Sequence, residues 1–361
     1  MQFNHKYYIP CLRWKMGEYQ AISHLNNTIK NNLIPLIEVP EIGWDFEKNI
    51  EAKTLDAQIE PFPKRVLNKW GQAPCFIDMH YIDFSKLMTD GTHAAKFIFD
   101  GLREKNCFAI PTIYLDSDNT YQKEIKLILE KDKMGVCLRM FIEQASKQTL
   151  KKDIDTLLKN LEIQLDEIHL ILDIGAPNFI PLVGFAKLIR KIVNDIPRLN
   201  DWKTFSIIGT SFPKSMGGIE RGITILPRHE WILYKEIIKD FSRQELRLPT
   251  FGDYVINHPS ISEIDMRLIK PAAVIRYTID DMWCIIKGKN IRENHEEYRD
   301  LSKMLISTQY YFGPQFSYGD EFIEKCALNA EKLGNLTTWR TVGTNHHIEK
   351  IVLDVANFHV S

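Results

Sequence analysis

Eight short apolar segments recur between residues 7 and 256, and each is rich in Ile, Val, Phe and Tyr. Their ranges are 7–14, 33–39, 74–80, 107–115, 135–142, 167–175, 204–212 and 251–256. Most of them do not alternate between apolar and polar positions, which is typical of strands that are buried on both faces. We therefore interpret these segments as eight buried strands.

Segments with helical spacing separate these strands. In "KKDIDTLLKNLEIQL" the apolar residues Ile154, Leu157, Leu158, Leu161 and Leu165 fall on one face of a helix. Consecutive strands begin 26 to 47 residues apart, which leaves room for one crossover helix each time. Eight such units predict an α/β fold of the TIM-like (β/α)₈ barrel type. An open doubly wound sheet is the alternative, but the first strand lacks the glycine-rich turn common in that fold.

The pattern changes after residue 268. The stretch "AAVIRYTIDDMWCIIKGK" predicts a hairpin that turns at Asp280 and Asp281, and helical segments follow at 293–306, 320–333 and 345–357. We expect residues 1–268 to form the barrel. Residues 269–361 are expected to form an extension of a hairpin and helices, packed on the barrel over its mouth.

Polar or ionisable side chains stand at the end of nearly every predicted strand. In chain order they are Arg13, Lys15 and Glu18; Glu38; Asp78 and His80; Thr112 and Tyr114; Arg139; Asp173; Thr210 and Ser211; Asp253 and Tyr254. The carboxyl ends of barrel strands converge on one mouth, where the function of such folds is built. Unpaired charges are costly to bury, so this pattern predicts a lined polar cavity.

Two interpretations of these charges remain open. In the functional one, Glu38, Asp78 or Asp173 acts as a base or metal ligand. Arg139, together with Arg13, Lys15 and Glu18, then binds a small anionic ligand. In the structural one, Arg139 and Asp173 form an ion pair that fills the barrel, and His80 is a hydrogen-bonded core histidine.

The stretch "TTWRTVGTNHHIEKIV" near the end of the chain adds a second candidate cluster. Asn345 is expected to cap a helix, which places His346 and His347 in its first turn, where the helix dipole favours an anion. We predict His347 as a catalytic acid and Arg340 and His346 as ligand-binding residues. The two histidines point in different directions, so at most one would join Asp78 or His80 around a metal. An ordinary capped helix with surface histidines is the alternative.

Composition narrows the classes of function. The 46 Lys and Arg residues balance 47 Asp and Glu residues, so no global charge directs the protein to nucleic acid or to a membrane surface. The six cysteines form no CxxC pair, and we expect them to be buried and reduced in a cytoplasmic protein. The chain shows no signal peptide, no apolar span of membrane length and no nucleotide or zinc motif. The sequence therefore identifies no cofactor.

Four stretches carry a resemblance to a known family. They are "YYIPCLRWKMGEYQAI", "LIPLIEVP", "YFGPQFSYGDEFIEKCA" and "TWRTVGTNHHIEKIV". They resemble the beta protein family of phages, satellite phages and bacterial mobile elements over nearly the whole chain. The resemblance implies a setting in accessory loci, some of them linked to anti-phage defence, and it suggests that the two terminal motifs act together. It implies no catalytic residue.

Two hypotheses of function follow. The first is a hydrolase, of phosphodiesterase or nuclease type, acting on a phosphorylated or nucleotide-like molecule or on a nucleic acid end. The second is a non-catalytic module that recognises a phage component or a partner protein from its own locus. Its contact surface would be the aromatic residues Tyr310, Tyr311, Phe312, Phe316 and Tyr318. The sequence does not indicate an oligomeric state.

Overall fold

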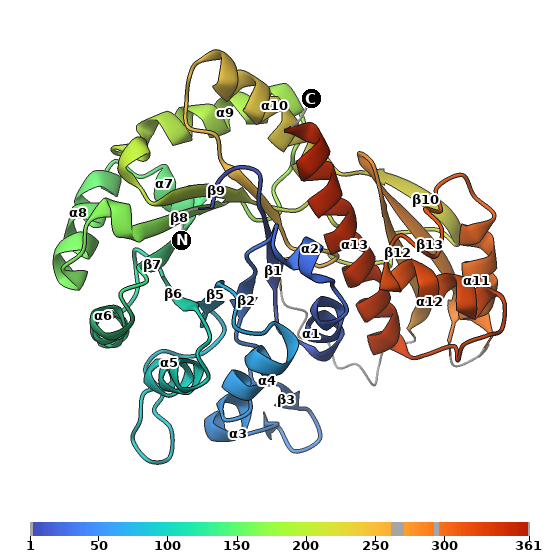
Figure 1. The fold of residues 1–361 in the computed structure, drawn as a ribbon, viewed down its shortest axis with the longest axis horizontal. Helices are drawn as coiled ribbons and strands as arrows, with labels where there is room; N and C mark the ends of the chain where they lie inside the picture. The colour runs from blue at the N-terminus through green and yellow to red at the C-terminus, as the bar shows by residue number, and fades with distance from the viewer. Residues whose placement is uncertain (1–2, 261–270, 292–295, 360–361) are drawn as a thin grey trace.

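Eight parallel strands close into a barrel in the computed structural model, which describes residues 3–260, 271–291 and 296–359 (Figure 1). The order around the barrel is β1-β11-β9-β8-β7-β6-β5-β2. The strands are β1 Tyr8–Leu12, β2 Leu36–Glu38, β5 Cys75–Asp78, β6 Ala109–Ile113, β7 Val136–Phe141, β8 Ile168–Asp173, β9 Thr204–Ile208 and β11 Thr250–Asp253. Each lies within or at the edge of one predicted segment, so the predicted (β/α)₈ barrel is confirmed.

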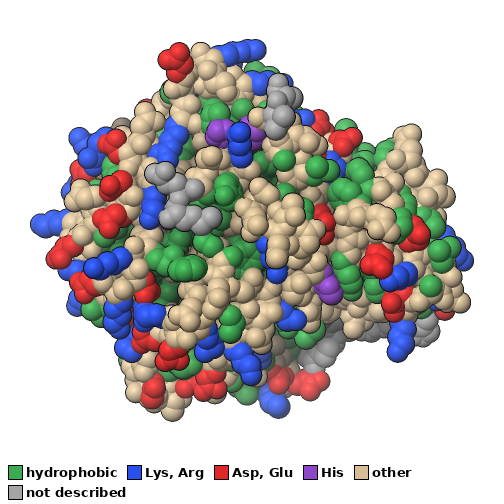
Figure 2. Space-filling model, viewed as in Figure 1, with side chains coloured by type: hydrophobic (Ala, Val, Ile, Leu, Met, Phe, Trp, Pro, Cys, Tyr) green, Lys and Arg blue, Asp and Glu red, His purple; other side chains and the backbone are tan. Residues whose placement is uncertain are grey.

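Helices cover the outside of the barrel. The longer ones are α1 Met16–Ser23, α4 Phe62–Lys69, α5 Ala94–Glu104, α6 Asn119–Asp132, α8 Leu150–Leu161, α9 Leu182–Asp195 and α10 His229–Arg243. Shorter elements in the connections are α2 Asn27–Lys30, β3 Trp44–Asp45, β4 Ile50–Glu51, α3 Leu55–Ile59 and α7 Ile142–Ala145, with 3₁₀ turns at Leu165–Glu167 and Leu199–Asp201. In α8 the predicted face is buried at Ile154, Leu157 and Leu161. On the face shown in Figure 2, acidic and basic side chains are interspersed.

The barrel interior is a packed core. Alternate strand residues, including Ile9, Cys11, Leu36 and Cys137, form one buried cluster inside it. All six cysteines are free and buried, as the sequence predicts. The charged residues at the carboxyl ends of the strands therefore lie at one end of an apolar barrel core.

A three-stranded antiparallel sheet forms the core of the extension. Strands β12 Ala272–Ile279 and β13 Met282–Asn290 pair as a hairpin across Asp280 and Asp281, which confirms that prediction. The third strand, β10 Gly222–Pro227, comes from the connection between β9 and α10 and pairs with β13. Its residues are at least partly exposed, so the search for buried apolar segments missed it. Helices α11 Glu297–Ile306 and α12 Tyr318–Ala327 complete this part of the described chain.

The final helix, α13 Leu336–Phe358, joins the extension to the barrel. Asn335 is its N-cap and accepts a hydrogen bond from the Thr338 amide, so the prediction of a helix capped by Asn345 was wrong. The first turns contain threonines and Gly343, which disfavour an isolated helix. Tertiary packing outweighs this preference, since a Cβ at Gly343 would lie 2.9 Å from the Arg276 carbonyl oxygen.

Contacts of α13 with both α1 and β12 place it between the barrel and the extension (Figure 1). A Cβ at Gly17 would overlap the Arg340 side chain, which shows how closely α1 and α13 approach. The extension lies beside the barrel along this helix in Figure 1, and the N-terminal half of α13 brings Arg340 to the loop that follows β11.

Candidate functional site

Four residues predicted from the strand ends meet at the mouth of the barrel. The Nη1 atom of Arg139 donates to Glu38 Oε1 and to Asp78 Oδ2, each at 2.7 Å. Its Nε atom donates to Asp173 Oδ2 at 2.9 Å. All four side chains are buried, with Arg139 only 2% exposed. We name these four residues the floor of the mouth.

Two tyrosines complete the hydrogen bonds of the floor. Tyr114 donates its hydroxyl to Asp78 Oδ2 at 2.6 Å. Tyr254 donates to Asp173 Oδ2 at 2.5 Å and accepts from Arg139 Nη2 at 2.8 Å. Burial, and then the adjacent carboxylates, raise the pKa of both tyrosines, so the two hydroxyl groups remain protonated donors.

The floor holds three carboxylates for one guanidinium group. Although burial opposes it, the adjacent Asp173 carboxylate raises the pKa of Arg139, which therefore stays charged. Glu38 Oε2 is buried and receives no hydrogen bond from the residues that the structure describes. A buried carboxylate oxygen without a donor calls for an explanation, which the described residues do not supply.

Aromatic side chains surround the floor. The Phe141 ring centroid lies 5.6 Å from the Arg139 guanidinium carbon. His80 is exposed, and its ring lies 5.4 Å from Tyr114 and 5.9 Å from Phe141. The interpretation of His80 as a core histidine was therefore wrong. Tyr81 lies beside Arg13, whose guanidinium carbon is 5.6 Å from the tyrosine ring centroid.

Arg13 and Arg340 lie beside the carboxylate of Glu18, and Arg276 lies next to Arg340. We name Arg13, Arg276, Arg340 and Glu18 the arginine cluster. Glu18 is 3% exposed and accepts a hydrogen bond from Asn257 at 2.7 Å. Burial raises its pKa, while the charges of Arg340 and Arg13 oppose that shift. Arg13 and Glu18 belong to the first of the two terminal motifs and Arg340 to the last, and the structure brings these residues together here.

Backbone carbonyls of the loop after β11 hold two of these arginines. Arg13 Nη2 donates to the carbonyl oxygens of His258 and Pro259 at 2.8 and 2.5 Å. Arg340 Nη1 donates to the Ile256 carbonyl oxygen at 3.0 Å and to Asn257 Oδ1 at 2.7 Å. The loop fixes two guanidinium groups at the rim.

Arg276, on β12, was missed by sequence reasoning. Its Nε atom is buried and has no hydrogen-bond partner among the residues that the structure describes. Burial, and then the charge of Arg340, lower the pKa of Arg276 to about 9. The signal that could have found it is a single arginine inside the apolar run "AAVIRYTI", the same signal that identified Arg139.

The structure does not bring His346 and His347 to the floor. His347 Nε2 lies 2.9 Å from Asp253 Oδ2, and its Nδ1 lies 2.7 Å from the Thr278 hydroxyl. His346 Nδ1 lies 2.8 Å from Asp320 Oδ2. Both histidines belong to the middle of α13 and are fully buried, so neither the first-turn placement nor the surface alternative is right. Burial lowers the pKa of His347, which favours the neutral ring.

The remaining predicted groups do not build a metal site. Lys15 is half exposed and pairs with Glu41 at 2.5 Å, away from the floor carboxylates. Among residues 3–260, 271–291 and 296–359, no three His, Cys, Asp or Glu side chains are grouped to hold a metal ion. Arg139 already occupies the space between Glu38, Asp78 and Asp173.

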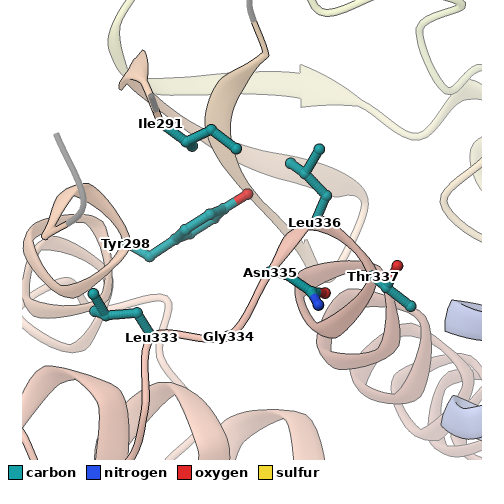
Figure 3. Close-up of a pocket in the computed structure, with 7 residues that line it drawn as sticks. All are labelled: Ile291, Tyr298, Leu333, Gly334, Asn335, Leu336 and Thr337. Atoms are coloured by element: carbon teal, nitrogen blue, oxygen red, sulfur yellow. The ribbon is translucent and has the colours of Figure 1, made fainter. Parts of the chain in front are cut away.

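An open pocket of about 430 Å³ lies at the start of α13 (Figure 3). Its lining residues are Ile291, Tyr298, Leu333, Gly334, Asn335, Leu336 and Thr337. Figure 3 shows the Tyr298 hydroxyl directed between Ile291 and Leu336. None of these residues belongs to the floor, so this pocket is separate from the mouth.

Comparison with known proteins identifies a family and a solved structure that are similar to most of the chain. The family model described as Beta protein matches residues 8–353. No curated protein matches the sequence. Among solved structures, the alanine racemase of Clostridium difficile 630 in complex with cycloserine is similar to 77% of this chain at 10% identity, with a TM-score of 0.34. The chain covers 60% of that protein's length. No described helix is long and apolar enough to span a bilayer.

Proposed function

The chain belongs to the beta protein family, and from this membership and its barrel mouth we propose that it hydrolyses a phosphorylated or nucleotide-like ligand in anti-phage defence. The ligand would lie on the floor of the mouth, with its phosphate toward the arginine cluster. The defence setting rests on the resemblance to phage and mobile-element proteins, and the ligand class rests on the charges of the site.

The arginine cluster is the observation that carries this proposal. Arg13 and Arg340 act on Glu18 there, Arg276 lies beside Arg340, and the Nε atom of Arg276 has no hydrogen-bond partner among the described residues. An anion would relieve the repulsion between Arg276 and Arg340 and would accept a hydrogen bond from the Nε atom of Arg276, which has no partner among the described residues. Arginine is the side chain best suited to binding phosphate, because its planar donors match two phosphate oxygens.

The aromatic side chains beside the floor suit the nucleobase of such a ligand. His80 is exposed beside Phe141, and Tyr81 lies beside Arg13. Planar rings at a site entrance can stack on a nucleobase, and such stacking tolerates different bases. This arrangement favours a nucleotide-like ligand over inorganic phosphate alone.

Glu38 is the proposed general base, because Oε2 is its one oxygen without a donor among the described residues. A water oxygen attacks phosphorus while Glu38 Oε2 takes the water proton. The bond from phosphorus to the leaving oxygen breaks, and His80 at the rim gives that oxygen a proton. Asp78 and Asp173 act as positioning residues, since each binds both Arg139 and a tyrosine.

Release of nitrophenol from bis(p-nitrophenyl) phosphate tests the catalytic step. Glu38→Gln keeps the hydrogen bond to Arg139 and removes the base, so the rate is expected to fall at least about 100-fold with unchanged folding. Glu143→Gln, at an exposed position on α7, is the matched control and retains the wild-type rate. Absence of hydrolysis by the wild-type protein, or an active Glu38→Gln variant, would contradict the proposed reaction.

A binding module is the second candidate, supported by one exposed aromatic ring that stacks on a partly buried one. Phe312 is 41% exposed and stacks on Phe316 at 4.8 Å, while Tyr310, Tyr311 and Tyr318 are half-buried. In a phage-infection assay, Phe312→Asp would abolish protection and Glu38→Gln would retain it if recognition alone is the function. The opposite pattern supports the hydrolase.

A further inference from the structure

A second pocket of about 430 Å³ lies where α1, α12 and α13 meet. Residues that line it include His24, Phe316, Ser317, Tyr318, Glu321 and Glu349. All of its lining residues lie in the described ranges, and none belongs to the floor or the arginine cluster. The proposed function leaves this pocket without a role.

One wall of the pocket is a flat aromatic pair. The rings of His24 and Tyr318 stack with centroids 3.6 Å apart and an interplanar angle of 2°. His24 follows α1, which packs on the barrel, and Tyr318 begins α12 of the extension. Burial, and then the charge of Lys69, lower the pKa of His24, so this wall carries no positive charge at neutral pH.

Glu349 brings a buried carboxyl group to the same pocket. It is 9% exposed, and no lysine or arginine pairs with it in the part of the chain that the structure describes. The next residue, Lys350, turns instead to Asp354 and Asp280. A buried acid without a cationic partner is costly, and a bound cation would remove that cost.

The other charged groups near Glu349 are already paired. From α12, Asp320 accepts hydrogen bonds from Ser317 and Tyr277 and faces His346 of α13. Glu321 pairs with Lys325 at 2.5 Å on the exposed side of α12.

Burial raises the pKa of Glu349 to about 7, against the opposing effects of His346 and of a hydrogen bond with Asn345. Glu349 is therefore the titrating group of the pocket near neutral pH.

We propose that this pocket binds a small alkylammonium cation, whose charge meets Glu349 and whose carbons lie against the His24–Tyr318 pair. An aromatic face attracts a cation electrostatically, and a carboxylate at short range adds direct pairing. Neither partner alone would define a site, but the pocket presents both. The proposal does not depend on hydrolysis at the barrel mouth.

Calorimetric titration of the full chain with butylammonium tests the site, with butanol as the neutral analogue of similar shape. We expect butylammonium to bind and butanol to bind at least about tenfold more weakly. Glu349→Gln should reduce the affinity about tenfold or more, while Glu130→Gln, at an exposed position on α6, should leave it unchanged. Equal binding of amine and alcohol, no detectable binding, or an unaffected Glu349→Gln variant would overturn the proposal.

The pH dependence of the wild-type protein provides a test without a variant. Because Glu349 is charged only above a pKa of about 7, butylammonium affinity should rise roughly tenfold between pH 6 and pH 8. A flat profile contradicts the role of Glu349. A parallel titration with Nα-acetyl-lysine N-methylamide distinguishes a free amine from a lysine side chain of a protein partner, according to which of the two binds more tightly.

Discussion

Arg139 Nη1 lies 2.7 Å from both Glu38 Oε1 and Asp78 Oδ2, so one nitrogen atom connects strands β2, β5 and β7 at the barrel mouth. The partners are 101 and 61 residues away along the chain. A guanidinium group with five donors can hold several carboxylates at once, which a lysine cannot do in a fixed geometry. Arg139 therefore determines how these three strand ends meet.

Replacement of Arg139 should strongly destabilise the protein. Arg139→Ala leaves Glu38, Asp78 and Asp173 buried without their cation, and breaking such a pair costs about 3–5 kcal/mol of unfolding free energy. Urea denaturation measures this loss. Arg190→Ala, which breaks a partly exposed pair with Asp240, should cost less than about 1 kcal/mol. Similar losses in the two variants would show that Arg139 is not the structural centre of the floor.

His347 is expected to serve stability and not the reaction. His347→Leu leaves Asp253 and Thr278 without their shared partner under α13, which should cost about 1–3 kcal/mol in unfolding free energy. The rate of phosphodiester hydrolysis per folded molecule should stay within about twofold of wild type. A folded His347→Leu protein with a hundredfold lower rate would restore the catalytic role that the sequence suggested.

The pH dependence of the unfolding free energy should reveal the titration of Glu349. Its pKa is raised from 4.5 to about 7 in the folded protein, so the folded state holds this proton more tightly than the unfolded state does. The unfolding free energy should therefore fall as pH rises from about 4.5 to 7, and acid should restore it. Glu349→Gln removes this effect. The unfolding free energy of the variant, relative to that of wild type, should therefore be about 1–2 kcal/mol higher at pH 8 than at pH 5.

Thermal or urea unfolding of both proteins at pH 5 and pH 8 measures this difference. A constant offset between wild type and Glu349→Gln at the two pH values would mean that Glu349 titrates normally.

The barrel could be predicted because its signals are local. Each strand is a compact apolar run, and the carboxyl-end rule of parallel barrels was enough to group Glu38, Asp78, Arg139 and Asp173. Their pairing was harder to predict, because the direction of a long side chain depends on the register of several strands. Both the cavity and the ion-pair interpretations therefore remained open at the sequence level.

The extension was predicted less well, because tertiary contacts define it. The start of α13 depends on Gly17 and Gly343 allowing close approach to α1 and β12, which no local preference shows. Arg276 was missed because its surroundings come from Arg340 of α13 and Tyr298 of α11, which no local pattern connects to it. The two histidines were misplaced because the helix begins at Leu336, ten residues before His346.

Arg276→Gln tests the central claim, that the arginine cluster binds a phosphorylated ligand. Because the Nε atom of Arg276 has no hydrogen-bond partner among the described residues and Arg276 is repelled by Arg340, its loss should leave the urea midpoint unchanged or higher. Arg190→Gln is the control for removing an arginine charge elsewhere.

Calorimetric titration with adenosine 5′-monophosphate is the most direct measurement. The account predicts that wild type and Arg190→Gln bind it, and that Arg276→Gln binds about 30-fold more weakly, the loss of one charged hydrogen bond of about 2 kcal/mol. Equal affinity of wild type and Arg276→Gln, or no binding by the wild-type protein, would contradict it.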